Sequence, residues 1–487
     1  MNQIGFKNFR KFKELAPIDL APVTIFVGEN NAGKSTVVKA ILSLLDFLNT
    51  RVNAIEDKSW VNIKFYFNNS YYTHLGTFDR AHNNKTSTND PITFILTTGN
   101  RRYEIDVKKS SSSESDVYGD VSRIKVTFLP LNIDITFLTE GHKNEMKITF
   151  HTQSYPGFVN DVKRTSLSDR SLKNYFRGLT KDIIIDSYYN TDINFIAVNI
   201  VDALMMSFNG CISDTYDLLN PKKVEKSPHA FYNLPKETID FLLKRKSILA
   251  KINSIERNFD VEYIYAHAVT QTVLYSAKDT NDYHVKTVHE FANKQIEKGS
   301  ILHSKIEEWM QEFNIGQDYD IKSIGGEAHI VKIQNFDNEW VNLSDKGMGS
   351  IQLMILFFRV ATKIAESDSV FNKRKYSNTL LIIEEPEQNL HPLLQSKLAD
   401  FFERINKDYG FYFIVETHSE YLIRKTQVII NKENKNSSNY TNPFKVVYFP
   451  GDDKAPYDML YRKDGKFSNE FGAGFFDEAA NLAFEIF

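Results

Sequence analysis

Residues 28–35 of this 487-residue chain read GENNAGKS, a spacing of glycines, lysine and serine that suits a chain of phosphates. Glycines let backbone N–H groups turn toward phosphate oxygens, and a following helix adds positive dipole. Lys34 would reach the outer phosphates, and the Ser35 hydroxyl would hold Mg²⁺. The apolar residues 23–27 predict a strand before this loop, and residues 34–49 have helical apolar spacing. The sequence therefore predicts a strand–loop–helix phosphate site.

Two carboxylates follow a second apolar run, in the segment LLIIEEPEQNLHP at residues 380–392. The run predicts a buried parallel strand that ends at Glu384 and Glu385. Neighbouring side chains at a strand end point to different sides, so the two carboxylates can have different roles. Glu384 is placed to hold a Mg²⁺ ion, and Glu385 to polarise the attacking water. The alternative is an acidic loop after a core strand, which is common when no phosphate loop accompanies it.

A third apolar run, FYFIVETHSE at residues 411–420, ends in His418. A histidine at the carboxyl edge of a sheet can hydrogen-bond a terminal phosphate and respond to its loss. A lone histidine there is more often structural. Its position one strand after the carboxylate pair favours the functional interpretation.

The fourth segment, NLSDKGMGSIQLM at residues 342–354, opens an apolar helix. Ser344, Gly347 and Gly349 together with the helix N-terminus could form an anion site. The alternative is a capped helix with a glycine entry. The order of the four segments along the chain favours the anion site over the capped helix.

Composition restricts the class of protein. The net charge is −3, from 59 basic and 62 acidic residues, so no overall basic field indicates nucleic acid as the partner. Cys211 is the single cysteine, so the sequence offers neither a disulfide framework nor a cysteine-based metal site. No apolar run approaches the roughly 18 residues that span a bilayer, and the N-terminus has no apolar signal core. We expect a cytoplasmic protein with no membrane partner.

The elements that must position these segments divide the chain into three parts. Residues 1–154 contain the phosphate loop and then alternating strands, and residues 319–487 alternate strand and helix in the manner of a doubly wound α/β fold. Residues 155–318 are predicted to be a mostly helical insertion and a candidate partner-binding region. Its two clearest helical stretches are residues 234–259 and 285–313.

The four segments and their order resemble the ABC-type ATPase heads of the RecF, SMC and OLD group. The opening residues 4–12, IGFKNFRKF, are similar to the first strand of that group. The closing residues 464–487 resemble the C-terminus of bacterial anti-phage defence ATPase subunits, a subgroup that includes AriA of PARIS and PtuA of Septu. The resemblance covers residues 1–150 and 320–487, and leaves the middle unmatched.

This resemblance implies an ATP-binding and ATP-hydrolysing head made of a β-rich lobe and a doubly wound α/β lobe. The implied catalytic residues are Glu385 and His418, and the implied Mg²⁺ ligands are Ser35 and Glu384. The implied nucleotide-binding residues of the phosphate loop are Asn31, Gly33, Lys34, Ser35 and Thr36. The implied residues that bind the nucleotide of a second copy are Ser344, Gly347 and Gly349.

Two departures from the group accompany the resemblance. Glu384 stands where the group usually has aspartate. A glutamine that usually senses Mg²⁺ has no clear equivalent, and His74 is the weak substitute that the sequence offers.

The chain has one copy of each segment, so the resemblance implies that two copies must meet to complete a nucleotide pocket. We expect a head-to-head homodimer, or a higher oligomer, closed by ATP and loosened by hydrolysis. The favoured role is an ATP-gated sensor or scaffold subunit of an anti-phage system that controls a separate, nuclease-like effector protein. Nucleic acid or a phage protein is the expected trigger.

The main alternative is a RecF-like ATPase that binds DNA in repair or recombination, compatible with the basic residues Arg101, Arg102, Lys108 and Lys109. Such a run is more often the solvated face of a hairpin. Two further alternatives, an OLD-type nuclease and a transporter subunit, are disfavoured. About 67 residues follow Glu420, too few for a nuclease domain of its own, and the large insertion is atypical of transporters.

Overall fold

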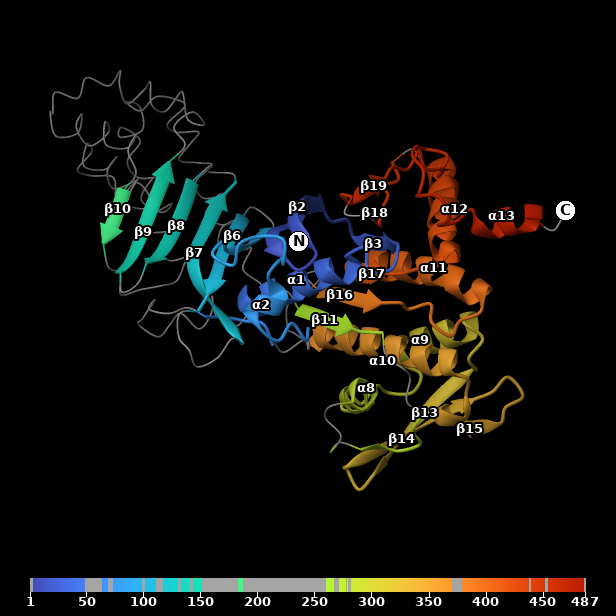
Figure 1. Ribbon diagram of the computed structural model, residues 1–487. Coiled ribbons are helices and arrows are strands. Elements are labelled where there is room, and N and C mark those ends of the chain that lie inside the picture. Colours follow the sequence, from blue (N-terminus) through green and yellow to red (C-terminus); the bar gives the residue numbers. More distant parts are fainter. Residues whose placement is uncertain are drawn as a thin grey trace, which may run out of the picture. The chain divides into compact units, whose positions relative to one another are not determined.

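The computed structural model describes fifteen stretches of the chain, which form two compact units. Unit 1 contains Met1–Leu20 and Thr36–Asn258, and unit 2 contains Ala21–Ser35 and Phe259–Phe487 (Figure 1). The described residues are 3–48, 64–68, 73–98, 101–110, 117–129, 133–140, 143–150, 183–186, 260–266, 271–276, 278, 282–369, 379–437, 439–451 and 454–485.

Unit 1 is built on a nine-stranded antiparallel sheet of order β10-β9-β8-β7-β6-β5-β1-β2, with β4 paired to β7. Apolar and polar residues alternate along these strands, which places one face of the sheet in the core. The alternating strands predicted after the phosphate loop within residues 1–154 correspond to β4 to β9 where the structure describes them. The strands are β1 Gln3–Phe9, β2 Phe12–Asp19, β4 Lys64–Tyr66, β5 Ile92–Thr98, β6 Arg101–Lys109, β7 Tyr118–Phe128, β8 Ile133–Glu140, β9 Lys143–Phe150 and β10 Ile183–Asp186.

The core of unit 1 is aromatic. Phe94 stacks on Phe65 with ring centroids 5.0 Å apart and meets the edge of Phe9 at 5.2 Å. All three side chains are fully buried. The helices that begin after the phosphate loop and after Thr77 are α1 Lys34–Phe47 and α2 Phe78–Ala81.

Unit 2 is built on a six-stranded sheet of order β11-β16-β17-β3-β18-β19, parallel except for β19. The central strands are near-continuous apolar runs because both of their faces are covered. The strand that ends in the carboxylate pair, β16, does not touch the phosphate-loop strand β3, because β17 lies between them. The strands are β3 Val23–Gly28, β11 Asp260–Ile264, β16 Thr379–Glu384, β17 Tyr412–Glu416, β18 Phe444–Phe449 and β19 Tyr457–Met459.

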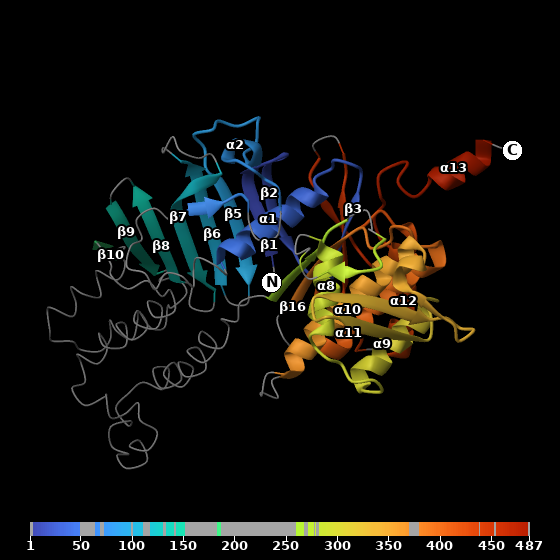
Figure 2. The ribbon, with the colours of Figure 1, turned by 90° about the horizontal axis from the view of Figure 1, so that it is seen from below.

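Helices and a smaller four-stranded sheet complete unit 2 (Figure 2). Trp309 of α9, Phe357 of α10 and Phe401 of α11 meet with ring centroids 5.3 to 5.6 Å apart, which joins three helices in one core. The helices are α8 Tyr283–Ala292, α9 Ile301–Glu312, α10 Met348–Ser369, α11 Pro392–Tyr409, α12 Glu420–Asn436 and α13 Glu478–Glu485. The small sheet contains β12 Tyr275–Ser276, β13 Asp318–Ile324, β14 Ala328–Gln334 and β15 Trp340–Asn342, and a 3-10 turn, η4 Leu343–Asp345, follows it.

The predicted α/β fold class is confirmed. Among the described residues, α10 is long and apolar enough over Met348–Ser367 to cross a bilayer, with a mean hydropathy of 1.4. Because 67% of that apolar stretch is buried inside the protein and its side chains belong to the core of unit 2, we interpret α10 as a core helix.

The insertion predicted over residues 155–318 contains one strand of the six-stranded sheet, β11, near its C-terminal end. The second segment of compact unit 2 begins at Phe259, and β11 pairs in parallel with β16 at the edge of the six-stranded sheet. The sequence of β11, DVEYI, conceals this strand because Asp260 and Glu262 interrupt its apolar pattern. The predicted helix 234–259 lies outside the described residues, and the helical content of the insertion there stays a prediction.

The predicted helical stretch 285–313 forms two helices rather than one. α8 ends at Ala292, and the left-handed φ of 49° at Gln295 does not allow the helix to continue. Ser300 then caps the N-terminus of α9 by accepting from the N–H of His303.

Candidate nucleotide-binding site

The phosphate loop follows β3, a strand whose six residues are all buried. Gly28 has a φ of 148°, and a Cβ at this position would lie 2.0 Å from the carbonyl oxygen of Phe449 on the neighbouring strand β18. Only glycine fits there. Gly33 also has a positive φ, 109°, and Asn31 adopts a left-handed φ of 57°. The glycine spacing therefore serves both the turn of the loop and its close packing on β18.

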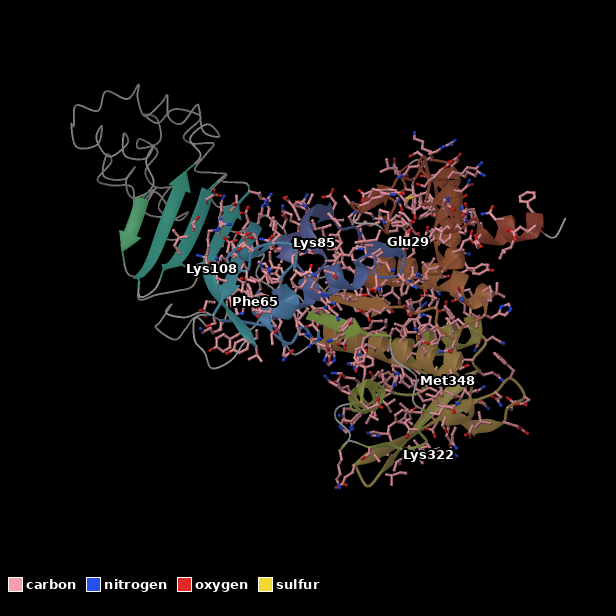
Figure 3. All side chains as sticks on the ribbon, in the orientation of Figure 1. Glu29, Phe65, Lys85, Lys108, Lys322 and Met348 are labelled. Carbon is pink, nitrogen blue, oxygen red and sulfur yellow. The ribbon has the colours of Figure 1, made fainter. Side chains whose placement is uncertain are left out.

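Lys34 folds its ammonium group back over this loop. Its Nζ donates to the carbonyl oxygens of Gly28, at 3.1 Å, and Glu29, at 2.9 Å. Burial lowers the pKa of Lys34, against the opposing effect of nearby carboxylates. Figure 3 labels Glu29 in this loop and Met348 at the first turn of α10.

The Ser35 hydroxyl contacts a carboxylate that the sequence reasoning did not single out. Its Oγ donates to Oε1 of Glu416, the last residue of β17, at 2.8 Å. Glu416 is opposite Phe26 of β3 on one side and Glu384 of β16 on the other. The carboxyl ends of these parallel strands meet at one edge of the sheet, so β17 brings Glu416 beside the phosphate loop.

Burial and the nearby charge of Glu384 raise the pKa of Glu416 to about 7. Its side chain is 6% exposed, and Oε2 is buried with no hydrogen-bond partner among the described residues. A buried carboxylate oxygen without a donor costs free energy, and a cation is one way to satisfy it.

Glu384 is one strand farther from the phosphate loop than Glu416. Tyr263 of β11 and Ala266, just after β11, donate to its carboxylate. The hydroxyl of Tyr263 donates to Oε1 at 2.7 Å, and the N–H of Ala266 donates to Oε2 at 3.4 Å. Burial and the charge of Glu384 raise the pKa of the Tyr263 hydroxyl, which keeps it a donor. The predicted metal ligand Glu384 thus already has two protein donors.

Glu385 has a left-handed backbone, with a φ of 45°. Its N–H donates to the carbonyl oxygen of Glu416 at 2.7 Å, and its carboxylate accepts from the amide of Gln388. Gln352 of α10 donates to the Glu385 carbonyl oxygen at 3.3 Å. These contacts turn Glu385 away from the direction of the strand.

Main-chain bonding fixes the position of His418 just beyond β17. Its N–H donates to Oε1 of the buried Glu387 at 2.7 Å, while its side chain reaches the surface. Partial desolvation and the positive charge of Lys34 lower the pKa of His418. The next residue, Ser419, caps α12 by accepting from the N–H of Leu422 at 3.1 Å.

The segment at residues 342–354 divides into an open part and a packed part. A Cβ on Gly347 would meet nothing within 4 Å, and the Ser344 hydroxyl donates to Asp345 in the same turn. Gly349, by contrast, packs its Cα against the loop after β16, where a Cβ would lie 2.5 Å from the Asn389 carbonyl oxygen. Gly349 is therefore required by packing inside unit 2, whatever else it does.

The remaining predicted residues are Thr36 and His74. Thr36 lies in the first turn of α1, beside Ser35. His74 lies in unit 1 with a left-handed φ of 52°, whereas the phosphate loop lies in unit 2.

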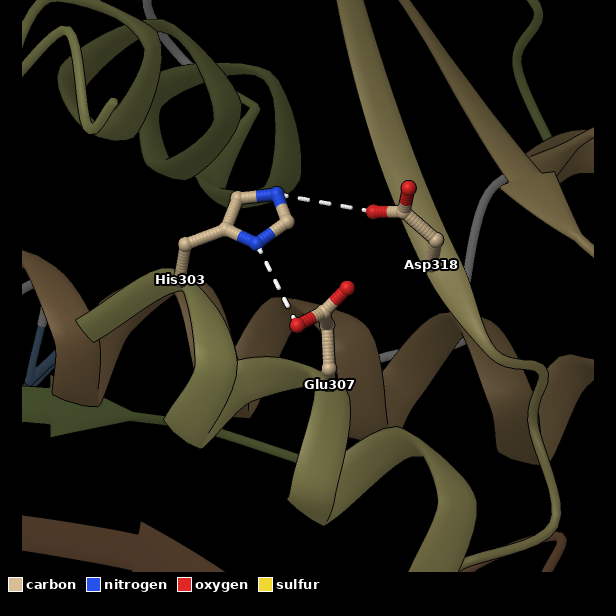
Figure 4. Close-up of side chains that lie close together, drawn as sticks. All are labelled: His303, Glu307 and Asp318. Carbon is tan, nitrogen blue, oxygen red and sulfur yellow. Dashed lines mark ion pairs between the residues drawn. The ribbon is translucent and has the colours of Figure 1, made fainter. Parts of the chain in front are cut away.

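A second cluster of polar side chains, in unit 2, surrounds His303 of α9 (Figure 4). Its Nδ1 lies 3.5 Å from Glu307 and its Nε2 lies 3.4 Å from Asp318. One ligand atom from each of the three side chains lies within 4.8 Å of the others, and each ring nitrogen faces a different carboxylate. Lys298 also pairs with Asp318, at 2.6 Å. The geometry fits a structural histidine held between two carboxylates, and the i, i+4 spacing of His303 and Glu307 is its signal in the sequence.

Fold and loop together define a P-loop ATPase of the α/β class. The chain belongs to the AAA ATPase domain family, whose model matches residues 1–423. No curated protein matches the chain.

Solved structures with some similarity include heads of Smc proteins. They include an Smc head domain with an extended coiled coil bound to the C-terminal domain of ScpA, from Pyrococcus furiosus (12% identity, 100% of this chain and 98% of that chain covered, TM-score 0.34). A second is an Smc head domain with a coiled coil and joint from Pyrococcus yayanosii (10% identity, 95% of this chain and 97% of that chain covered, TM-score 0.34). A third is an SMC head domain from Thermotoga maritima (8% identity, 92% of this chain and 94% of that chain covered, TM-score 0.30). At these TM-scores the likeness establishes neither function nor partner for this chain.

Proposed function

We propose that the chain binds ATP with Mg²⁺ and hydrolyses it between two copies that meet head to head. The observation that carries the proposal is the convergence of Lys34, Ser35 and the acidic strand ends of β16 and β17 at one loop. Several carboxylates beside a phosphate-binding loop would repel a triphosphate. A divalent cation between them removes that conflict, and the hydroxyl and carboxylate oxygens present are the ligands that Mg²⁺ prefers.

Each predicted residue has a role in this proposal. Mg²⁺, when bound, neutralises phosphate charge and lowers the barrier to phosphoryl transfer. Ser35 and a carboxylate at the strand ends, predicted from the sequence as Glu384, would hold it. Lys34 would leave the two loop carbonyl oxygens that it now contacts and bind phosphate oxygens instead. Glu385 polarises the attacking water, and His418 hydrogen-bonds the terminal phosphate. Asn31, Gly33 and Thr36 line the phosphate chain.

The second half of the pocket comes from another copy in this proposal. Ser344, Gly347 and Gly349 precede or open α10, whose N-terminus offers N–H groups to an anion. The open space at Gly347 supports this assignment, because a surface that meets a nucleotide in trans must be accessible.

Glu385→Gln tests the proposal directly. The variant should bind ATP with the affinity of the unaltered chain, lose hydrolysis, and accumulate as a dimer with ATP, because the pocket closes but cannot turn over. Turnover and sedimentation of the variant with ATP and with ADP measure these effects. Hydrolysis at the wild-type rate would remove Glu385 from its role.

We further propose that the nucleotide-driven dimer is the sensor or scaffold subunit of an anti-phage system and controls a separate nuclease-like effector, in response to nucleic acid or a phage protein. The resemblance of residues 464–487 to such subunits supports this role. Purification of the tagged chain from its host, with ATP and with ADP, should recover one stoichiometric effector in only one of the two states. Infection assays with and without the Lys34→Ala variant then test the role in defence.

The basic residues that were compatible with DNA binding in repair give that alternative little support. Arg101 is 2% exposed, Arg102 pairs with Glu104 at 3.2 Å, and Lys109 pairs with Asp79 at 2.6 Å. Of the four, Lys108 is the exposed cation for which no acidic partner is described. We therefore retain the effector-controlling role as the proposal.

A further inference from the structure

We propose that Glu416, rather than Glu384, is the carboxylate that binds the nucleotide-associated Mg²⁺ directly, together with Ser35. This inference rests on the proposed function, since it assigns a ligand to the cation of the same site. It concerns the last residue of β17, in a segment, residues 411–420, where the sequence pointed to His418 alone as functional.

The first argument is distance. Oε1 of Glu416 lies 2.8 Å from Oγ of Ser35. Oxygens that occupy neighbouring positions around an octahedral Mg²⁺ lie about 2.9 Å apart when each is 2.0–2.1 Å from the ion. A cation could therefore bind both oxygens after the hydroxyl proton of Ser35 turns away, with little movement of either side chain.

The second argument is the unsatisfied oxygen. Oε2 of Glu416 is buried and has no hydrogen-bond partner among the described residues, and the side chain is 6% exposed. Buried polar atoms are nearly always paired, so an unpaired carboxylate oxygen beside a phosphate loop indicates a missing positive ligand.

The third argument concerns the competing carboxylate. Both oxygens of Glu384 accept hydrogen bonds from β11 or the residues just after it, namely from Tyr263 and Ala266. The strand order also places Glu384 one strand farther from β3 than Glu416 is. Each oxygen of Glu384 therefore already has one protein donor, whereas Oε2 of Glu416 has none among the described residues. In this arrangement Glu384 acts from behind, as a negative charge that strengthens the site.

The test separates metal binding from nucleotide binding. Affinity for a fluorescent ATP analogue is measured in EDTA and across a Mg²⁺ titration, and binding of Mn²⁺ in the presence of the analogue is followed by electron paramagnetic resonance. Glu416→Gln keeps the shape of the side chain and an acceptor oxygen for Ser35 but removes the charge. Glu384→Gln is the matched change on the neighbouring strand. Glu403→Gln is the control outside the site. Glu403 lies on α11 and its partly buried carboxylate accepts a hydrogen bond from the hydroxyl of Tyr440.

We expect Glu416→Gln to leave the affinity for the ATP analogue in EDTA within about 3-fold of the wild-type value. The Mg²⁺ concentration that gives half of the full Mg²⁺ effect on this affinity should rise by at least about 10-fold, because the variant disturbs the ligand environment of the metal. The Mn²⁺ signal of the bound ion should be lost in the same variant. Glu384→Gln should shift the Mg²⁺ requirement less, and Glu403→Gln not at all. Glu416→Asp, which keeps the charge on a shorter side chain, should restore part of the metal binding.

An unchanged Mg²⁺ requirement in Glu416→Gln, with the large shift in Glu384→Gln instead, would overturn the inference and leave the proposed function standing. Failure of the wild-type chain to bind the analogue under any condition would overturn the proposed function itself. If Glu416→Gln does not fold, as judged by its melting temperature, Glu416→Asp alone decides. A wild-type Mg²⁺ requirement and Mn²⁺ signal in that variant count against the assignment.

Discussion

Lys34 is the residue on which nucleotide binding depends most in our proposal. Its ammonium contacts two loop carbonyls and no other described group by hydrogen bond, so its loss should cost the fold little. We expect Lys34→Ala to weaken ATP binding on the order of 10- to 100-fold, because charged hydrogen bonds to phosphate are lost. Isothermal titration calorimetry measures the change.

Lys39, which lies on α1 outside the loop motif, provides the control through Lys39→Ala. Equal ATP affinity in Lys34→Ala and wild type would contradict the assignment of residues 28–35 as the phosphate site.

At the residue scale, the sequence identified a site but not its full set of side chains. Spacing alone pointed to Lys34 and Ser35, because glycines and a helix start are local features. Glu416 was in the same short segment as His418, yet nothing local distinguishes it from a carboxylate at the end of any strand. Its contact with Ser35 depends on β17 lying between β3 and β16, and strand order is not written in any one segment. The roles of the predicted site residues stay predictions.

At the scale of elements, the loop after β16 and the first turn of α10 meet at Gly349. A Cβ there would lie 2.5 Å from the Asn389 carbonyl oxygen and 2.8 Å from the Leu390 side chain. We expect Gly349→Ala to destabilise unit 2 by about 1–3 kcal/mol through overpacking. Gly347→Ala is the matched control, since its Cβ would enter open space and its stability should change by less than about 1 kcal/mol.

Urea unfolding of the two glycine variants, followed by the fluorescence of Trp309 and the other tryptophans, measures the difference. Equal urea midpoints for the two variants would mean that the loop after β16 accommodates the added methyl group, and that packing does not require glycine at position 349.

A buried ion-pair network joins β11, α8 and α10. Arg359 is 2% exposed, donates to Thr287 at 2.7 Å, contacts Glu290, and lies 3.4 Å from Glu262. Removing one partner of a buried ion pair leaves the other charge buried without a partner. We therefore expect Arg359→Met to lower the free energy of unfolding by about 3–5 kcal/mol.

The control for this variant is Arg462→Met, which removes an exposed pair with Asp464 and should cost at most about 1 kcal/mol. Thermal unfolding compares the two. A similar, small loss of stability in both variants would show that Arg359 is not needed to hold α8 and β11 in place.

The same network explains why the sequence does not reveal β11 as a strand of unit 2. Glu262 interrupts the apolar pattern of β11, so the strand is not recognisable by itself. Arg359 and Lys363, about a hundred residues later, neutralise its charge. Long apolar runs such as β3, β16 and β17 were predicted correctly because their burial is encoded locally, whereas an edge strand that depends on distant partners is not.

At the scale of the whole molecule, our proposal requires that two copies share each nucleotide. Ser344→Arg tests this without touching the phosphate loop. Ser344 is partly exposed and its hydroxyl bonds within its own turn, so an arginine should be tolerated by the fold. We expect the variant to bind ATP as a monomer with unaltered affinity, because its own phosphate loop is intact, but to fail to dimerise and therefore to lose hydrolysis.

Sedimentation velocity with ATP, in the background of Glu385→Gln to prevent turnover, gives the oligomeric state. Mixing Ser344→Arg with a Lys34→Ala chain sharpens the test, because each chain then lacks a different half of the pocket. A mixed dimer would still contain one complete pocket, built from the phosphate loop of the Ser344→Arg chain and the intact residues 344–349 of the other. Recovery of up to about half of the wild-type hydrolysis per dimer is therefore expected on mixing. Two inactive chains that stay inactive together, or a Ser344→Arg chain that dimerises normally with ATP, would contradict a pocket shared between copies.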